Sequence, residues 1–232
     1  MRIVDTPTTR SELPFPRLIE ALRALFVQGC EVPARHSHRI DVPGGEAGTV
    51  LLMHGWRSSH HFGLKTVAIF PGNARRGLPG LHATYTLFDA TTGVPLAQLD
   101  GTEVTSRRTA AASALAASFL ARVDASRLLI VTDLAAQGFA ADATQDLERA
   151  AGEADLISCA TLSHTALIHG AWLRPGTHLD LIGGFTPAMR ESDAECFSRA
   201  QVYVDTPEAL AKSGDVLQAV AEERLADHQA FT

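Results

Sequence analysis

The apolar positions near the N-terminus repeat with a helical period. Residues 14–29 place large apolar side chains at positions 18, 19, 22, 25 and 26, which fall on one side of a helix. Pro16 lies near the start of this segment and Gly29 lies just past its end, as is usual at the two ends of a helix. The pattern predicts a helix over residues 14–29.

Between residues 49 and 100 the pattern changes to short runs rich in β-branched and aromatic residues. Four runs, TVLLMHGW, LKTVAIFP, ATYTLFDA and PLAQLD, are separated by segments of Gly, Pro and Asn. They predict an antiparallel meander in which TTGVP forms a hairpin turn. An alanine-rich stretch over residues 104–122 then predicts one long helix, with Thr105 or Ser106 as its N-cap.

From residue 127 onward, strands alternate with helices. RLLIV at 127–131 is short and fully apolar, which is typical of a strand buried on both faces of a parallel sheet. The other predicted elements are a helix over 144–153 and strands over 155–161, 177–185 and 202–205. The alternation predicts a Rossmann-like parallel sheet. The predicted fold class is α/β, with this sheet in one domain and an antiparallel sheet in a second, α+β domain.

Composition and charge narrow the class of protein. The chain has 232 residues, is 46% hydrophobic and has a mean hydropathy of +0.05, which fits a packed soluble core. A net charge of −6 gives no basic surface for nucleic acid, and no apolar run approaches the ~18 residues that span a bilayer. The N-terminus lacks a signal-peptide pattern, and the three cysteines are widely spaced, so we expect a cytoplasmic protein with reduced thiols.

Four basic residues lie before the alanine-rich helix or at its start: Arg35, Lys65, Arg107 and Arg108. Lys65 lies inside an apolar strand, where its ammonium needs a partner or a cavity. Arg108 lies near the predicted start of the alanine-rich helix, where an anion would gain from the guanidinium and from the helix dipole. The set indicates a site for a small carboxylate or phosphate, and the alternative is solvated charge at exposed strand and helix ends.

Other familiar chemistry is not supported by the spacing of residues. The pairs His60-His61 and His36-x-His38 lack the spacing of metal ligands, so no metal site is predicted, and no G-x-S-x-G elbow is present. After 127–131 the chain continues as TDLAAQGF, without the G-x-G-x-x-G turn that holds the pyrophosphate of a dinucleotide. Pattern alone therefore does not predict a nucleotide site.

Several motifs together resemble the ornithine cyclodeaminase/mu-crystallin family. The similarity is carried by G-L-K-T-V, P-G-N-A-R-R-G-L-P, T-G-V-P-L-A and R-T-A-A-A-S-A-L-A. It continues through ADLISCATLS, GAWLRPGTHLDLIGGFTPAMRE and VYVDTPEALAKSGDVLQ, in the order of the family. Together these pieces cover most of residues 30–220.

The resemblance implies a homodimeric enzyme that uses NAD(P)H on a small cyclic imino acid. It implies a substrate-binding and dimerisation domain over 1–125, a Rossmann-like nucleotide-binding domain over 126–205, and a return to the first domain over 206–232. Arg35, Lys65 and Arg108 resemble the residues that hold the substrate carboxylate. Thr161 resembles a position beside the nicotinamide ribose, and Leu179, Asp180, Leu181 and Ile182 resemble the segment along the nicotinamide face.

One departure from the family pattern concerns the reaction. Cyclodeaminases carry an aspartate, which performs acid/base work, at the position where this chain has Phe185, in IGGFTPAMRE. A phenyl ring cannot carry a proton, so the resemblance favours the branch that reduces cyclic ketimines such as Δ1-pyrroline-2-carboxylate or Δ1-piperideine-2-carboxylate. Two alternatives stay open: a cyclodeaminase or amino-acid dehydrogenase with a displaced acid such as Asp180 or Glu191, and a non-catalytic dimer that binds a small ligand.

The second departure concerns length. Family members continue after a strand like 127–131 with a glycine-rich turn and a further βαβ unit of ~30 residues, which is absent after Val131. The end at AFT also precedes the family's last helical stretch. Two interpretations are open: the protein truly lacks these pieces and binds its cofactor poorly, or the sequence omits segments of a longer chain. We favour omission, because a sheet without its first crossover would leave apolar faces uncovered.

Overall fold

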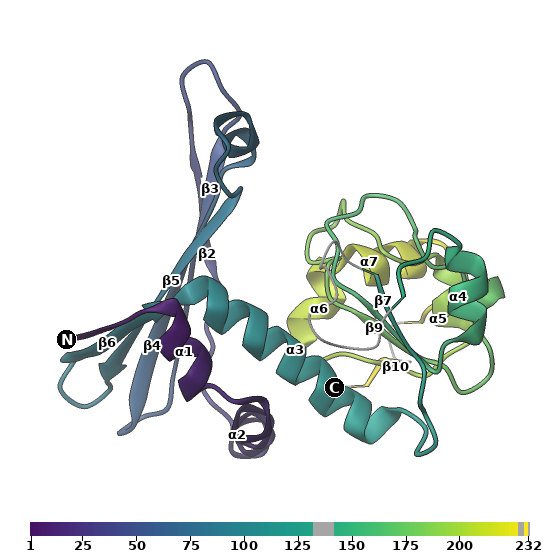
Figure 1. The fold of residues 1–232 in the computed structure, drawn as a ribbon, viewed down its shortest axis with the longest axis horizontal. Coiled ribbons are helices and arrows are strands. Elements are labelled where there is room, and N and C mark those ends of the chain that lie inside the picture. Colours follow the sequence, from purple (N-terminus) through teal and green to yellow (C-terminus); the bar gives the residue numbers. More distant parts are fainter. Residues whose placement is uncertain (132–141, 227–229, 232) are drawn as a thin grey trace. The chain divides into compact units, whose positions relative to one another are not determined.

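The computed structural model describes residues 1–131, 142–226 and 230–231. The chain divides into two compact units, Met1–Leu115 and Ala116–Thr232 (Figure 1), and each is described by itself. The first contains a mixed six-stranded sheet with three helices, and the second contains a parallel sheet covered by short helices. The predicted α/β class, with separate parallel and antiparallel sheets, is confirmed.

The sheet of the first unit has the strand order β1-β6-β5-β4-β3-β2. Its strands are β1 (Arg2–Val4), β2 (His36–Ile40), β3 (Gly48–Trp56), β4 (His61–Ile69), β5 (Leu81–Asp89) and β6 (Pro95–Asp100). Strands β2 to β6 pair with one another in antiparallel fashion, so the predicted meander is confirmed. Strand β1 joins the sheet parallel to β6. Neither β1 nor β2 was predicted. Gly93 has φ +73 in the predicted hairpin turn between β5 and β6.

The helices of the first unit begin and end at clear signals. They are α1 (Thr6–Glu12), α2 (Phe15–Gln28) and α3 (Gly101–Leu120), which crosses the boundary between the units, and β4 is followed by the 3-10 helix η1 (Pro71–Arg76). Helix α2 confirms the predicted helix over 14–29. The predicted N-cap of α3 is wrong: the side chain of Asp100 accepts from the backbone N–H groups of Thr102 and Glu103, at 2.8 and 3.0 Å. A carboxylate beside those free N–H groups starts the helix earlier than Thr105.

The second unit contains three parallel strands in the order β7-β8-β9. They are β7 (Leu128–Val131), β8 (Leu156–Cys159) and β9 (His178–Leu181). The helical segments are α4 (Leu147–Glu153), η2 (Gly170–Trp172), α5 (Ala194–Ser198), α6 (Pro207–Lys212) and α7 (Gly214–Ala221). One face of the sheet packs on a core that includes Val131, Ile157, Ile168, Phe197 and Val216.

Two predictions about these strands are wrong. Strand β7 is not buried on both faces, because Leu128 and Ile130, which share one face, are 59% and 56% exposed. The predicted fourth strand, β10 (Val202–Tyr203), pairs with β11 (Ala230–Phe231) instead of joining the parallel sheet. Apolar content alone indicated a buried strand, and what covers each face depends on other parts of the fold.

The C-terminal helices lie in the second unit. Helix α7 packs against α5 and against α6, and its buried side chains include Val216 and Ala219 of the same core. The assignment of domain roles to 1–125, 126–205 and 206–232 stays a prediction.

Candidate functional site

Lys65 lies in the middle of β4, opposite Met53 of β3 and Tyr85 of β5. Its Nζ donates to Thr105 Oγ1 of α3 at 3.3 Å. Burial, followed by repulsion from Arg108 and Arg35, lowers the pKa of Lys65 to about 8. The sheet therefore holds a half-buried amine that is mainly protonated at neutral pH and lies close to two guanidinium groups.

Arg108 lies three residues after Thr105 on α3, so both project from the same side of the helix. Arg35 immediately precedes β2 and is half-buried, whereas Arg108 is exposed. The structure thus brings Arg35, Lys65 and Arg108 into one cationic cluster, although they are far apart in sequence. Three cations that lie close together suit a carboxylate, which can accept from several donors at once.

The predicted reason for an anion next to Arg108 needs correction. Helix α3 begins at Gly101, so Arg108 lies beyond its first turn, where the free N–H groups and the dipole no longer act strongly. The remaining attraction comes from the side-chain charges of the cluster. Gly101 lets α3 approach β5, because a Cβ there would lie 2.6 Å from the backbone of Thr84.

Arg107 belongs to a different environment. Its Nε donates to the carbonyl oxygen of Leu13 at 2.7 Å, and its guanidinium lies 4.2 Å from the centre of the Phe15 ring. A longer ion pair joins it to Glu103 at 3.7 Å. These contacts tie α2 to α3, so Arg107 serves packing and is not part of the cationic cluster.

In the second unit, Thr161 and Gly183 lie just beyond the carboxyl ends of β8 and β9, and a buried glutamate joins them. Glu191 is fully buried, and its Oε1 accepts from the backbone N–H and the hydroxyl of Thr161 at 2.5 and 2.7 Å. Its Oε2 accepts from the N–H of Gly183 at 2.6 Å. Because both oxygens accept hydrogen bonds inside the protein and the side chain is 0% exposed, the structure gives Glu191 no access to a substrate proton.

The segment 179–182 alternates between two environments. Leu179 and Leu181 pack against the buried core, and Asp180 Oδ2 accepts from Ser158 Oγ on the neighbouring strand at 2.9 Å. Ile182 continues the pairing, since its N–H donates to the carbonyl oxygen of Cys159 at 2.9 Å. Phe185 is 38% exposed in the turn after β9.

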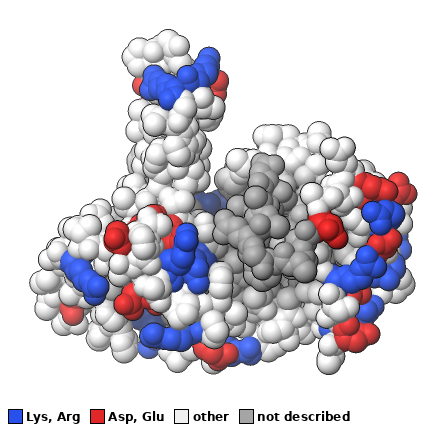
Figure 2. Space-filling model, in the orientation of Figure 1, with Lys and Arg blue, Asp and Glu red and all other residues white. Residues whose placement is uncertain are grey.

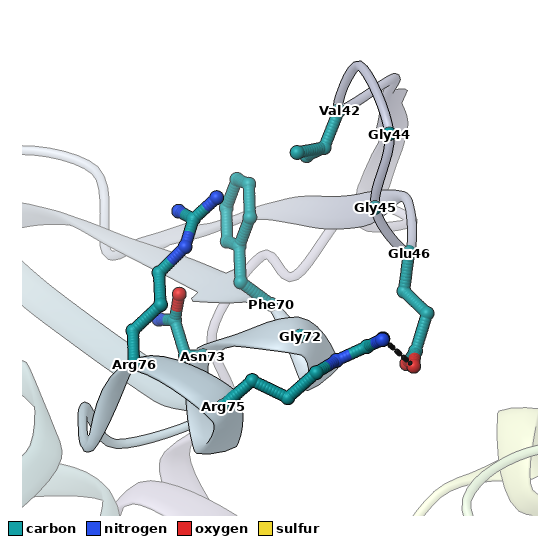
Figure 3. Close-up of a pocket in the computed structure, with 9 residues that line it drawn as sticks. All are labelled: Val42, Gly44, Gly45, Glu46, Phe70, Gly72, Asn73, Arg75 and Arg76. Carbon is teal, nitrogen blue, oxygen red and sulfur yellow. Dashed lines mark hydrogen bonds and ion pairs between the residues drawn. The ribbon is translucent and has the colours of Figure 1, made fainter.

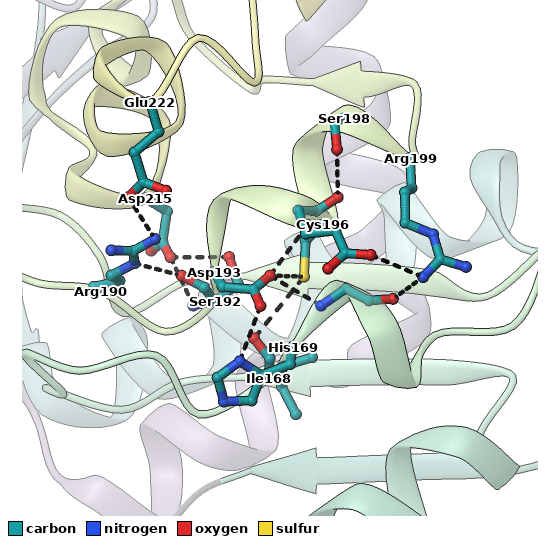
Figure 4. Close-up of polar contacts among 12 residues, drawn as sticks. Ile168, His169, Arg190, Ser192, Asp193, Cys196, Ser198, Arg199, Asp215 and Glu222 are labelled. Carbon is teal, nitrogen blue, oxygen red and sulfur yellow. Dashed lines mark hydrogen bonds and ion pairs between the residues drawn. The ribbon is translucent and has the colours of Figure 1, made fainter.

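Asp215 is a buried residue that the sequence did not single out. It is 2% exposed, and its Oδ1 accepts from the backbone N–H of Glu191 at 2.9 Å. The same oxygen accepts from the backbone N–H and the hydroxyl of Ser192 at 2.8 and 3.1 Å (Figure 4). The only sequence signal for this packing is the set of small residues around it: Gly183, Gly184 and Gly214.

The remaining surface features lie away from these residues. A cavity of about 210 Å³ lies between the turn after β2 and η1, where Arg75 pairs with Glu46 at 2.5 Å (Figure 3). None of the predicted site residues lines it. Acidic and basic side chains are mixed on the face shown in Figure 2. Among the described residues, no three His, Cys, Asp or Glu side chains gather to hold a metal ion.

No described helix combines the length and the apolar character needed to cross a bilayer.

The carboxyl ends of β8 and β9 are where the resemblance implies the nicotinamide end of the cofactor. Ligands of open parallel sheets bind beyond the carboxyl ends of the strands, where Thr161 and Gly183 are fixed by Glu191. Thr161 is the position that the resemblance places beside the nicotinamide ribose, and the roles of Thr161 and of Leu179, Asp180, Leu181 and Ile182 at the cofactor stay predictions. The place of a pyrophosphate-binding turn, directly after β7, falls in 132–141 and lies outside the described residues.

The fold defines an α/β protein in which a mixed sheet carries a cationic cluster and a parallel sheet carries fixed strand ends. The model of the ornithine cyclodeaminase/mu-crystallin family matches residues 16–133 and 130–230, so the chain belongs to that family.

Named relatives support the same membership. An uncharacterised protein of Schizosaccharomyces pombe is 40% identical over 265 aligned positions, which cover 95% of this chain and 80% of that protein. The Δ1-pyrroline-2-carboxylate reductase of Paracoccus denitrificans is 35% identical over 88% of this chain and 75% of its own length. The structure of Thermococcus litoralis Δ1-pyrroline-2-carboxylate reductase in complex with NADH and L-proline shares the fold, with a TM-score of 0.81 and 24% identity over 100% of this chain and 84% of that chain.

The comparisons also locate a gap in this chain. The 265 positions aligned with the S. pombe protein exceed the 232 residues present here, so at least 33 of them have no counterpart in this chain. The family model matches in two pieces that meet at residues 130–133. This is the end of β7, where the sequence predicts a missing βαβ unit and where Leu128 and Ile130 are exposed.

Proposed function

We propose that this protein reduces the C=N bond of a small cyclic imino acid, with NAD(P)H as the hydride donor. The observation that carries the proposal is the cationic cluster of Arg35, Lys65 and Arg108, in which a desolvated amine adjoins two guanidinium groups. A cyclic ketimine such as Δ1-pyrroline-2-carboxylate or Δ1-piperideine-2-carboxylate has the carboxylate that this cluster suits. The named reductases among the relatives support the same reaction class.

The proposed division of labour follows from the chemistry of each group. The bound cofactor supplies the hydride that adds to the imine carbon. Arg35 and Arg108 hold the carboxylate, which fixes the ring and its C=N bond in one orientation. Lys65 Nζ, protonated at neutral pH because its pKa is about 8, holds the proton that the imine nitrogen gains. The product is a secondary amine with one new C–H bond and one new N–H bond.

Phe185 separates this proposal from cyclodeamination. Release of ammonia from ornithine requires a group that moves protons at the end of β9, and the side chain there is a phenyl ring. The two displaced acids do not replace it, because Glu191 is fully buried with both oxygens hydrogen-bonded, and Asp180 is hydrogen-bonded to Ser158. We therefore expect no ammonia release from ornithine.

The direct test is NADH or NADPH oxidation with Δ1-pyrroline-2-carboxylate, after intact mass confirms the chain used. Arg108→Ala should raise KM by about 10–100-fold, because a charge-assisted bond to a carboxylate contributes about 1.5–3 kcal/mol. Arg75→Ala is the matched control, since Arg75 pairs with Glu46 away from the cluster, and it should leave KM unchanged. An unchanged KM in the Arg108 variant would refute the carboxylate assignment.

A homodimer is part of the proposal. Most side chains of β3 and β4 are only partly buried within the single chain, so this sheet leaves area for a second copy. Light scattering of the eluted protein should give twice the chain mass of 24.7 kDa. A monomer at micromolar concentration would contradict this part of the proposal.

The gap after β7 favours a second candidate function, a dimer that binds a small carboxylate without turnover. A chain without the glycine-rich turn loses the backbone N–H groups that hold a pyrophosphate. Titration of NADH fluorescence decides between the two candidates. Binding at micromolar concentration supports the reductase, and retention of the imino acid without any NADH binding supports the binder.

A further inference from the structure

We propose that Glu191 and Asp215 are positioning residues that fix the ends of β8 and β9 for the reaction. This inference rests on the proposed function, because it gives a purpose to the rigidity of Thr161 and Gly183. Neither carboxylate reaches solvent: Glu191 is 0% and Asp215 is 2% exposed. The burial of a carboxylate is energetically costly, so two of them side by side in this place indicate a role.

The two side chains act in series. Asp215, at the start of α7, holds the backbone of Glu191 and Ser192 through Oδ1. Glu191 then reaches across to the ends of both strands and holds Thr161 and Gly183. The result is one chain of contacts that runs from α7 through 191–192 to the carboxyl edge of the parallel sheet, where ligands of such sheets bind.

Close packing shows that the segments cannot shift independently. A Cβ at Gly183 would lie 1.8 Å from the carbonyl oxygen of Thr161, and one at Gly184 would lie 2.1 Å from Asp215 Oδ2. A Cβ at Gly214 would lie 1.9 Å from the carbonyl oxygen of Met189. The Gly214 N–H also donates to the carbonyl oxygen of Gly184 at 2.8 Å. Glycines at these positions allow the backbones to pack directly on the carboxylates.

The two carboxylates use their oxygens differently, so their amide variants are expected to behave differently. Glu191 uses both oxygens as acceptors, so a glutamine would set its NH₂ group against an N–H or O–H donor. Asp215 accepts all three of its bonds on Oδ1, and within the described residues Oδ2 is buried without a hydrogen-bond partner. An asparagine at this position therefore keeps the Oδ1 acceptor that makes all three hydrogen bonds.

The test compares Glu191→Gln, Asp215→Asn and Asp215→Ala with the control Asp155→Asn. Asp155 is a buried carboxylate of the same unit whose Oδ2 accepts from the N–H groups of Ser126 and Arg127. Its Oδ1 pairs with Arg122 and Arg174, so its replacement also disturbs both oxygens of a buried carboxylate, without contact to Thr161 or Gly183. Near-ultraviolet circular dichroism first shows that each variant is folded. Turnover is then measured with Δ1-pyrroline-2-carboxylate and NADH, together with hydrogen exchange at the amides of Thr161 and Gly183.

We expect Glu191→Gln and Asp215→Ala to lower kcat by about 100-fold, the effect of a misplaced reacting group, with KM for the imino acid within twofold of the wild type. Asp215→Asn and Asp155→Asn should keep kcat within about threefold. Exchange at Thr161 and Gly183 should accelerate only in the two damaging variants. In a double-mutant cycle, Glu191→Gln and Thr161→Val together should lower kcat by less than the product of the two single losses, because part of the effect of the glutamate passes through the Thr161 hydroxyl.

Three results would overturn the inference. One is a folded Glu191→Gln variant with wild-type kcat and wild-type exchange. Another is a loss of kcat in Asp155→Asn equal to that in Glu191→Gln, which would show a general effect of stability. The third is equal damage from Asp215→Asn and Asp215→Ala. A wild-type protein without turnover would refute the proposed function instead, and the exchange experiment would still test the carboxylate contacts.

Discussion

Replacement of Lys65 by methionine should make the protein more stable and less active at the same time. Methionine has a similar length and no charge, so it fills the same place on β4 opposite Tyr85. It removes an ammonium that is desolvated and repelled by Arg108 and Arg35. The same ammonium is the proposed proton source and part of the carboxylate site.

The size of the gain follows from the pKa of Lys65, which falls from 10.5 to about 8. A shift of that size corresponds to at most ~3.5 kcal/mol, and screening by solvent at a half-buried site reduces it to about 1–2 kcal/mol. Below pH 8 the amine is charged in both the folded and the unfolded chain, so the whole penalty is present at pH 7. Between pH 8 and 10.5 the folded protein loses this proton first, and the stability of the wild type should rise.

Urea unfolding measures this gain. In a Trp172→Phe background, Trp56 of β3 is the one remaining tryptophan and reports on the first unit. Lys65→Met should raise the unfolding free energy at pH 7, and the difference from the wild type should shrink toward pH 9.5. Burial raises the pKa of Tyr85, so the phenol stays neutral over this range.

The same substitution should lower enzymatic activity. Lys65→Met should raise KM for the imino acid by about 10–100-fold, and Lys65→Arg, which keeps the charge, should preserve KM while it lowers kcat. The kcat/KM of the wild type should fall above pH 8 and that of the arginine variant should not. A methionine variant that is less stable at pH 7, or an arginine variant with the same alkaline limb, would refute the reasoning.

Three further predictions concern structure and specificity. Gly183→Ala should lower the free energy of unfolding by about 1–3 kcal/mol or prevent folding, because the added Cβ would lie 2.4 Å from Glu191 Oε1. Urea unfolding measures this loss. The control is Gly93→Ala, which lies in open space at φ +73 and should lower the free energy of unfolding by only about 1 kcal/mol. Asp100→Ala should lower the free energy of unfolding by about 1 kcal/mol, because α3 loses its N-cap. Asp100→Asn should recover most of this loss, and an asparagine variant as unstable as the alanine variant would show that the side chain is not the cap. Phe185→Asp should still release no ammonia from ornithine in a coupled assay if an acid at this position is necessary but not sufficient for deamination. Measurable release would place the site closer to the cyclodeaminases.

Local patterns were sufficient to predict much of the fold. The helical period with Pro16 and Gly29 predicts α2 to within a residue at each end, because those signals act within one segment. The four β-rich runs and the TTGVP turn predict the meander for the same reason. Errors occurred where a distant residue decides the outcome, as at β7, whose Leu128 and Ile130 lack a covering layer, and at β10, which pairs with β11.

The candidate site divides in the same way. The sequence alone determined that Lys65 is unusual, since a charge inside an apolar strand needs a partner, and its motifs determined the family. Only the tertiary structure decided that Arg108 joins Lys65 while Arg107 packs on Phe15, because the turn of α3 points neighbouring side chains in different directions. It also decided that the Glu191 carboxylate accepts hydrogen bonds from Thr161 and Gly183 and does not face a ligand. Burial and hydrogen-bond geometry are properties of segments that meet only in the folded chain.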